Sequence, residues 1–304
     1  MGHSDTRLTA PKDRLRRLVR AVVPKPVRYR LRTFAPKIRL LSSYHAVRRA
    51  PIASAKYLLF DRELDNFTYE LANEEELAQF LARTLGVTPD EATGYIGELQ
   101  GDDSLRAAIR ERLSSRADRN RTMPYGRRLG WYAAARARKA RTIVETGVHD
   151  GLGSTVLLQA LKRNAADGSD GRLISFDINP GAGWLIPSDL RSRHELHIGN
   201  SLDLLVPALD GREVDLFIHD SDHRYEHETA EFEAVLDVAR QQAILISDNA
   251  HGGTAFKDFC ERHRLPFHLF MEVPANHFYA GAGLGLTLKE SPGDIEARAR
   301  RLSP

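Results

Sequence analysis

The strongest constraint on the fold is a regular alternation of short apolar strands and helices between residues 142 and 288. Seven strands are expected, at residues 142–146, 172–178, 195–198, 214–219, 243–247, 267–273 and 284–288. Strands separated by helices form parallel sheets that carry helices on both faces. No helical pattern separates the last two strands. The sequence therefore predicts an α/β fold with a doubly wound, seven-stranded, mostly parallel sheet and an antiparallel last strand.

The remaining segments differ in character from this α/β part. We predict a basic arm at 1–50, a small helical cap or lid at 51–120, the α/β domain at 121–290 and a C-terminal tail at 291–304. Within the cap, Asn73 and Glu76 have the spacing of a capping box. Thr88 followed by Pro89 predicts the start of another helix. The α/β domain is thus preceded by a helical N-terminal region.

The arm carries most of the basic excess of the chain. Residues 1–50 contain fourteen Lys or Arg against two Asp, whereas the rest holds 30 basic and 39 acidic side chains. Residues 13–44 interleave arginine with apolar residues, and Pro24, Pro26 and Pro36 are expected to break them into short helical pieces. Such a segment is a candidate for peripheral contact with an anionic membrane. The alternative is an arm that is solvated or packs on the body or on a partner subunit of a homo-oligomer.

Composition narrows the cellular context. No apolar run approaches the roughly 20 residues of a membrane-spanning helix. Cys260 is the single cysteine, which excludes an internal disulfide and a multi-cysteine zinc site. We expect a buried structural thiol there and a cytoplasmic protein, with any membrane contact at the inner face. The basic arm lacks an aromatic stacking platform or a recognition motif, which disfavours a nucleic-acid partner.

A glycine-rich turn follows the first expected strand, in the stretch from Glu145 to Ser154. Its spacing, Gly-x-x-x-Gly-x-Gly from Gly147 to Gly153, differs from that of a dinucleotide-binding loop. A helix that begins near Ser154 would turn its first amides towards a ligand. Glu145, placed before the first glycine, suits a ligand with a cationic amino group and would repel a pyrophosphate.

Two further polar positions follow the second and third strands. Asp177 ends the second strand, where a carboxylate can accept hydrogen bonds from both hydroxyls of a ribose. Ser201 lies in the small polar turn after the third strand, where it would border an adenine. Each feature alone is also compatible with an ordinary turn, but together they indicate an adenosine-containing ligand.

The fourth and fifth strands end in clusters of polar side chains. Asp220 and His223 follow the fourth strand, and Asp248 and Asn249 follow the fifth. Ligands bind beyond the carboxyl ends of strands in open α/β sheets, so both clusters are expected at one site. Asp220, Asp248 and Asn249 offer the hard oxygen ligands that Mg²⁺ prefers. A purely hydrogen-bonded polar floor is the alternative.

At this point the sequence resembles a known family. Residues 141–154, RTIVETGVHDGLGS, are similar to the first motif of class I methyltransferases, in the branch of macrolide-sugar and catechol-type O-methyltransferases. The resemblance spans residues 121–289 and implies a Rossmann-like fold and S-adenosylmethionine as cofactor. The cofactor contacts it implies are Glu145, Gly147, Gly151, Ser154 and Asp177. Magnesium-dependent sugar O-methyltransferases also carry an Asp-x-Asp-His stretch like residues 220–223, but an acidic pair where this chain has Asp248 and Asn249.

The expected activity is methyl transfer to a hydroxyl of a small molecule, sugar or glycolipid. A divalent cation would lower the pKa of that hydroxyl, and His223 would remove its proton beside Asp220. A metal-independent methyltransferase acting on nitrogen or oxygen is the alternative. A nucleic-acid-binding protein and a non-catalytic scaffold that binds the cofactor are further possibilities.

Overall fold

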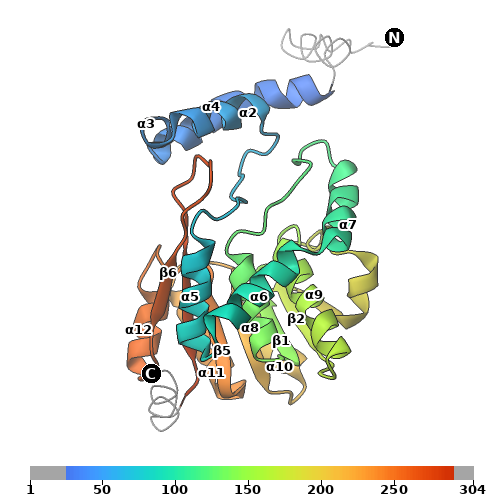
Figure 1. Cartoon of the computed structure of the whole chain (residues 1–304), viewed down its shortest axis with the longest axis vertical. Coiled ribbons are helices and arrows are strands. Elements are labelled where there is room, and N and C mark those ends of the chain that lie inside the picture. Colours follow the sequence, from blue (N-terminus) through green and yellow to red (C-terminus); the bar gives the residue numbers. More distant parts are fainter. Residues whose placement is uncertain (1–24, 291–304) are drawn as a thin grey trace, which may run out of the picture. The chain divides into compact units, whose positions relative to one another are not determined.

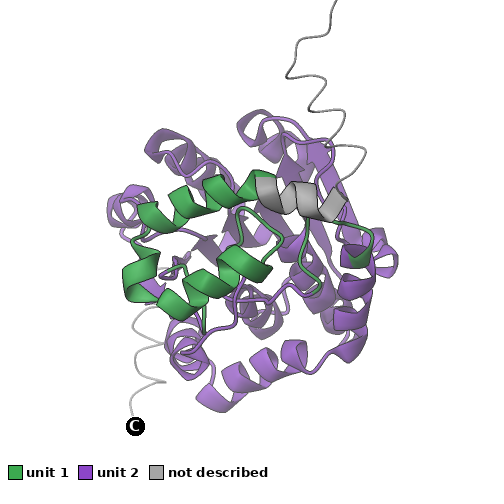
Figure 2. Cartoon of the chain, turned by 90° about the horizontal axis from the view of Figure 1, so that it is seen from above, with its two compact units in different colours: residues 1–67, 114–121, 276–279 green, residues 68–113, 122–275, 280–304 purple. Residues whose placement is uncertain are grey.

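A computed structural model describes residues 25–290, which form two compact units (Figure 2). The first unit holds the chain up to Phe67 together with residues 114–121 and 276–279. The second holds residues 68–113, 122–275 and those from 280 onward. Residues 1–24 of the expected arm and the expected tail at 291–304 lie outside the described residues. The four-part division of the chain stays a prediction.

The second unit is built on a seven-stranded sheet. Its strands are β1 (Thr142–Thr146), β2 (Arg172–Asp177), β3 (His194–Ile198), β4 (Val214–His219), β5 (Ala239–Ser247), β6 (His268–Met271) and β7 (Gly283–Leu288). Their order is β3-β2-β1-β4-β5-β7-β6. Only β7 among them runs antiparallel, against both β5 and β6. The predicted fold class, including the antiparallel last strand, is confirmed.

Helices cover both faces of this sheet (Figure 1). One layer contains α5 (Glu74–Leu85), α6 (Pro89–Gln100), α8 (Arg128–Ala137) and α9 (Leu152–Ala166), and the other contains α10 (Ser201–Leu209), α11 (Tyr225–Val238) and α12 (Ala255–Arg262). The central strands β1, β2 and β4 are largely buried on both sides because helices cover both. Phe232 and Val235 of α11 face the core, as their helical spacing predicts, and Cys260 is buried there.

The helices before the sheet begin close to the predicted positions, but one predicted cap is wrong. Thr88 and Glu91 form a complete capping box at the start of α6. Asn73 makes no side-chain cap to α5. Its amide instead donates to Met271 O and accepts from Val273 N, each at 3.0 Å. Asn73 also donates to Glu76 Oε2 at 3.0 Å, but its amide oxygen accepts from Val273 and not from the first turn of α5.

The first unit contains α2 (Lys25–Ser43), α3 (Ala46–Arg49) and α4 (Pro51–Phe60). The prediction that prolines divide this segment is wrong for its described part. Pro26 lies in the first turn of α2, where its missing amide has no intrahelical partner, and the helix continues through Pro36 with one hydrogen bond fewer. Lys37 joins α2 to α4 by donating to the carbonyls of Tyr57 and Asp61.

Several apolar side chains of the first unit are exposed. Ile52, Leu59 and Phe60 of α4 are 86%, 56% and 68% exposed. Membrane attachment through residues 13–44 stays a prediction. Within residues 25–290, no helix combines the length and hydropathy that crossing a bilayer requires.

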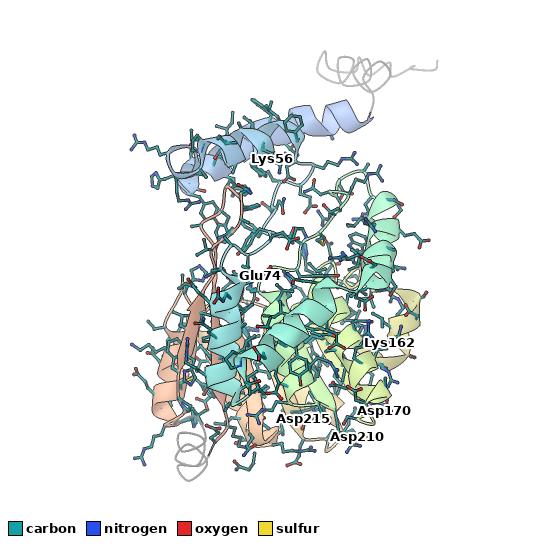
Figure 3. The ribbon with its side chains drawn as sticks, viewed as in Figure 1. Lys56, Glu74, Lys162, Asp170, Asp210 and Asp215 are labelled. Atoms are coloured by element: carbon teal, nitrogen blue, oxygen red, sulfur yellow. The ribbon has the colours of Figure 1, made fainter. Side chains whose placement is uncertain are left out.

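Acidic residues at the amino-terminal edge of the sheet serve the fold. Figure 3 shows Asp170, Asp210 and Asp215 at that edge. The Asp215 carboxylate accepts hydrogen bonds from the amides of Arg141 and Thr142, each at 2.9 Å, and so fixes the start of β1. The polar groups available for chemistry lie at the opposite edge, where the parallel strands end.

Candidate active site

The turn after β1 depends on glycines at two positions. Gly147 has φ +82°, and a Cβ there would lie 2.0 Å from the carbonyl oxygen of Asp220. Gly151 has φ +97° and is the N-cap of α9. Both positions lie in the left-handed region that favours glycine. The turn can therefore pack against the end of β4, which brings the loop next to the acid cluster.

Glu145 is buried beneath this turn. Its carboxylate accepts hydrogen bonds from Ser154 Oγ at 2.5 Å and Ser175 Oγ at 2.9 Å. Burial raises the pKa of Glu145 to about 7, although these two hydroxyls lower it. Ser154 is itself fully buried with its hydroxyl on Glu145. We therefore expect Ser154 to act on a ligand through Glu145.

The raised pKa of Glu145 predicts a pH-dependent cofactor affinity. Because the free protein favours the protonated acid, Glu145 must lose a proton before its carboxylate can pair with a cationic amino group. Affinity for S-adenosylhomocysteine should therefore rise with pH up to about 7, by about tenfold per unit well below that value. Calorimetry from pH 5.5 to 8 measures this. Glu145→Gln should remove the dependence, and an equal slope in that variant would contradict the assignment.

Asp177 lies at the end of β2, directly against the glycine turn. One carboxylate oxygen accepts from the amides of Val148 and His149, at 2.9 and 2.8 Å, and the other accepts from the amide of Asn179. Asp177 thus holds the turn in place. Its remaining acceptor capacity is available to a ribose, which is the role predicted for it.

Replacing Asp177 by Ala should lower the affinity for S-adenosylhomocysteine at least tenfold, equivalent to about 1.4 kcal/mol. The variant loses the expected ribose contact and the two hydrogen bonds to the turn. Calorimetry gives the affinity, and circular dichroism checks the fold. Asp189→Ala is the control, because Asp189 pairs with Lys162 on the exposed surface. A folded Asp177→Ala variant with unchanged affinity would rule out this cofactor contact.

Ser201 has a different environment from the one expected. It begins α10, is 6% exposed and donates its hydroxyl to Glu231. Any contact of Ser201 with an adenine would therefore come from its backbone. Asn200, the preceding residue, caps α10 through its side chain.

Glu231 is a buried acceptor that sequence reasoning missed. Its carboxylate accepts hydrogen bonds from Thr146 Oγ1 at 2.6 Å and Ser221 Oγ at 2.9 Å, and it pairs with His219 Nδ1 at 2.6 Å. Burial opposes ionisation, but His219 and the hydroxyl donors lower the pKa of Glu231 to about 2. The sequence feature that could have revealed Glu231 is its position four residues before Val235, on the apolar face of α11. The carboxylate ties α11 to the ends of β1 and β4.

Asp220 and Asp248 follow neighbouring parallel strands, β4 and β5, and lie together as predicted. Asp248 is fully buried and makes a two-pronged ion pair with Arg127, whose Nε lies 2.5 Å from Oδ1. Burial opposes ionisation of Asp248, but the Arg127 charge lowers its pKa to about 2. Burial, together with the negative charge of Asp248, raises the pKa of Asp220 well above its usual range.

The ion pair made by Arg127 is the main feature of the site that the sequence did not reveal. Arg127 directly precedes α8 and is 7% exposed. Besides Asp248, its guanidinium lies 3.4 Å from Glu272 Oε2, at the end of β6. The pair joins residues 121 positions apart, so no local pattern signals it. The neighbouring Arg128 lies 3.9 Å from Asp220.

His223 and Asn249 complete the group. His223 Nε2 lies 2.7 Å from Asn249 Nδ2 and 3.8 Å from Asp220 Oδ1. Burial, reinforced by neighbouring His219, lowers the pKa of His223 below its usual value of 6.5. The imidazole is therefore neutral near pH 7. The structure thus brings the predicted residues Asp220, His223, Asp248 and Asn249 into one cluster.

A second group of possible metal ligands lies beside this cluster. His219, His223 and Glu228 offer ligand atoms that all lie within 4.8 Å of one another. His219 Nε2 is buried and has no hydrogen-bond partner among residues 25–290, while its Nδ1 pairs with Glu231. The His219–Glu231 pair resembles the carboxylate–histidine pairs in which a carboxylate orients a metal-binding imidazole. The histidine ligands differ from the oxygen ligands predicted for Mg²⁺.

Comparisons with known proteins bear on what this cluster does. Residues 144–250 match a family profile described as a methyltransferase domain. No curated protein sequence matches the chain significantly. The matched segment contains the glycine turn, Asp177 and the polar ends of β4 and β5.

Several solved structures are also similar. O-methyltransferase TomG from Streptomyces achromogenes, in complex with SAM, is 24% identical over 62% of this chain and 91% of its own, with a TM-score of 0.46. An O-methyltransferase from Bacillus cereus in complex with SAH is 14% identical over 70% and 96%, with a TM-score of 0.42. A methyltransferase from Geobacter sulfurreducens is 20% identical over 63% and 95%, with a TM-score of 0.43.

The matched profile and the sheet order lead to the same conclusion. The profile covers β1 to β5 and ends directly after Asn249. The sheet around it has the mostly parallel order expected from the resemblance, with β7 antiparallel. Residues 144–250 therefore form a methyltransferase domain, and the sheet that carries it has the doubly wound order predicted from the sequence.

Proposed function

We propose that the protein methylates a hydroxyl oxygen of a small-molecule, sugar or glycolipid acceptor. The observation that carries this proposal is the position of His223, a neutral imidazole beside Asp220 at the carboxyl end of β4. β4 pairs with β1, the strand that leads into the glycine turn. A base at that place would meet an acceptor next to the cofactor's methyl group.

The reaction needs one proton acceptor and one correctly placed oxygen. The acceptor oxygen forms a bond to the methyl carbon as the carbon–sulfur bond of the sulfonium breaks, which leaves S-adenosylhomocysteine. His223 takes the hydroxyl proton and becomes an imidazolium, which the negative charge of the nearby Asp248 carboxylate stabilises. Asp220 also offers an oxygen to orient the acceptor hydroxyl. Atoms and charge balance without a further reactant.

The carboxyl cluster fits a divalent cation. Asp220, Asp248 and Asn249 supply oxygen atoms of the kind that Mg²⁺ prefers. Desolvation and the negative charge of Asp248 both raise the pKa of Asp220, so the cluster disfavours a second carboxylate charge. A bound cation would stabilise that charge, and it would lower the pKa of an acceptor hydroxyl.

A second candidate, methyl transfer without a metal, is favoured by Arg127. Its guanidinium occupies both oxygens of Asp248 and so supplies a positive charge within the cluster. In that case Arg127 would neutralise the carboxylates, and His223 alone would activate the acceptor.

Removal of divalent cations separates the two candidates. If a cation is required, enzyme treated with a chelator should lose most of its turnover, and Mg²⁺ should restore it. Asp220→Asn should weaken the response to Mg²⁺ because it removes a charged ligand. Cofactor affinity, measured by calorimetry, should stay nearly unchanged in both experiments. Full turnover after chelation, together with an active Asp248→Asn variant, would instead establish the metal-independent candidate.

A further inference from the structure

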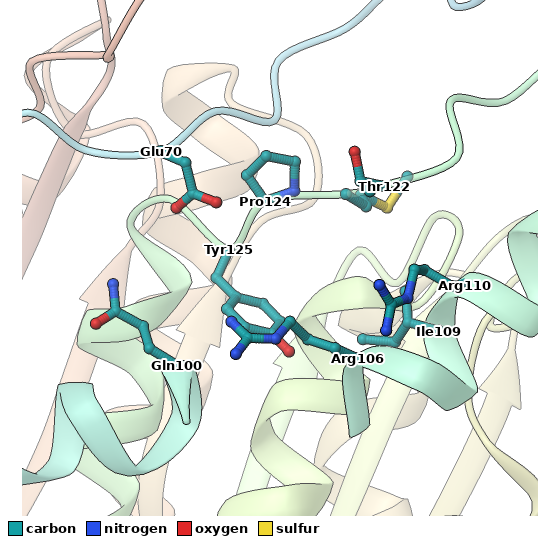
Figure 4. A pocket seen from close by; sticks show the side chains of 9 residues that line it. Glu70, Gln100, Arg106, Ile109, Arg110, Thr122, Pro124 and Tyr125 are labelled. Carbon is teal, nitrogen blue, oxygen red and sulfur yellow. The ribbon is translucent and has the colours of Figure 1, made fainter. Parts of the chain in front are cut away.

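A pocket of about 460 Å³ lies in the second unit, apart from the residues discussed above (Figure 4). Its walls come from α7 (Asp103–Ser114), the end of α6 and the segment that leads into α8. Ile109 and Met123 provide apolar surface, while Arg106, Arg110 and Tyr125 provide polar groups. Such a mixture of apolar walls and a few polar groups is typical of small-molecule sites.

Two arginines make the charge of this pocket positive. Among the described residues, Arg110 has no hydrogen bond or ion pair. Arg106 pairs only with Asp103, at 3.1 Å, and Asp103 is 91% exposed, so water weakens that pair. Glu70 is the one acidic residue of the lining; burial and the nearby Glu74 raise its pKa, while the charge of Arg106 lowers it. Both guanidinium groups are therefore available to donate hydrogen bonds to a bound anion.

Tyr125 adds a donor to the same pocket. The residue is 5% exposed, and within the described chain its buried hydroxyl has no hydrogen-bond partner. Leaving a buried hydroxyl without a partner costs about 1–3 kcal/mol. Figure 4 shows its ring between the Glu70 and Gln100 side of the pocket and the two arginines. A bound ligand would satisfy this hydroxyl.

The pocket is connected to the methyl-transfer site through the chain. Tyr125 lies two residues before Arg127, which binds Asp248. On the other side, Arg112 of α7 donates to Trp184 O at 2.9 Å, and Trp184 Nε1 donates to Asp150 in the glycine turn at 2.6 Å. Both walls of the pocket are therefore fixed to residues at the carboxyl ends of the strands.

We propose that this pocket binds the anionic group of the methyl acceptor, a carboxylate or a phosphate, through Arg106, Arg110 and the Tyr125 hydroxyl. The apolar walls would hold the carbon skeleton next to that group. This inference rests on the proposed function, since it assigns the pocket to the acceptor. It narrows the acceptor class to acidic molecules that carry a hydroxyl.

Binding of three matched probes tests the proposal without any methyl transfer. Benzoate carries a carboxylate, phenyl phosphate carries a phosphate, and methyl benzoate has the same ring without charge. Ligand-observed NMR titration of the full chain should show at least one anionic probe binding about tenfold tighter than methyl benzoate. The anionic probe that binds more tightly shows whether the pocket prefers a carboxylate or a phosphate. Equal or tighter binding of methyl benzoate would overturn the proposal.

Variants then assign the binding to this pocket. Arg106→Met and Arg110→Met should each weaken binding of the preferred anion about tenfold. Tyr125→Phe should weaken it a few-fold, in proportion to one neutral hydrogen bond. Arg262→Met on α12 is the matched control, because that arginine is exposed and far from the pocket lining. Unchanged affinity in the Arg106→Met/Arg110→Met double variant would overturn the proposal.

Cofactor binding keeps this test distinct from the proposed function. Arg106 and Arg110 are exposed on α7, so the variants should fold and bind S-adenosylhomocysteine like the parent protein. If the parent protein fails to bind S-adenosylhomocysteine, the proposed function is wrong, whatever the probes do. If it binds the cofactor but shows no preference for the anionic probes, only the assignment of the pocket is wrong.

Discussion

Replacing His223 by Ala is expected to lower turnover by about 10²- to 10⁴-fold, the usual effect of losing a general base. The imidazole is the neutral nitrogen base beside Asp220, with Nε2 at 3.8 Å from that carboxyl and 2.7 Å from Asn249. Without it, the acceptor proton would have to pass to water or to a carboxyl. Steady-state methyl transfer from S-adenosylmethionine measures the effect once an acceptor is in hand.

The pH profile distinguishes a base from a residue that only shapes the site. Burial lowers the pKa of His223 in the free enzyme, so the base stays unprotonated until the pH falls below 6.5. Turnover should therefore rise with pH below 6.5 and level off near neutrality. His223→Ala should lose this acidic limb. His263→Ala is the control, since that histidine pairs with Glu233 away from the cluster. An unchanged profile in His223→Ala would show that another group takes the proton.

The fold was largely predictable because the strand pattern repeats. The central parallel strands β1, β2 and β4 are largely buried on both faces, so each appears in the sequence as a short apolar run. Strand ends were less certain. β5 begins at Ala239, four residues before the predicted start, because Ala239 pairs with Val214 of β4 ahead of a register shift, and regular pairing resumes at Ile244. α2 continues through Pro36 although proline is a helix breaker.

The candidate site was predictable where backbone topology alone fixes it. Strand ends in a parallel sheet meet at one edge, so Asp220 and Asp248 had to be neighbours. Side-chain pairing was not predictable in the same way. Arg127 lies outside the matched family segment, and its contact with Asp248 depends on how α8 packs. The contacts of Glu231 could not be predicted from the sequence either, because its five partners come from four separate segments.

The Arg127–Asp248 pair is also expected to dominate local stability. Arg127→Met should lower the free energy of unfolding by about 3–5 kcal/mol, because it leaves a buried carboxylate without its counter-charge. Asp248 is fully buried, and Glu272 beside it is 3% exposed. Urea denaturation followed by circular dichroism gives the change. Arg172→Met is the matched control, since Arg172 pairs with Glu195 on the surface, where such pairs contribute about 0–1 kcal/mol.

The cause of this loss of stability can be tested by also removing the unpaired buried charge of Asp248. An Arg127→Met/Asp248→Asn double variant should recover part of the stability, because neither partner is then left ionised in the interior. Mg²⁺ provides a second route to the same end. If Asp220, Asp248 and Asn249 hold a divalent cation, Mg²⁺ should stabilise Arg127→Met more than the parent protein, by an amount that grows with its concentration. A loss below about 1 kcal/mol in Arg127→Met would place this pair in the class of weak surface ion pairs despite its burial.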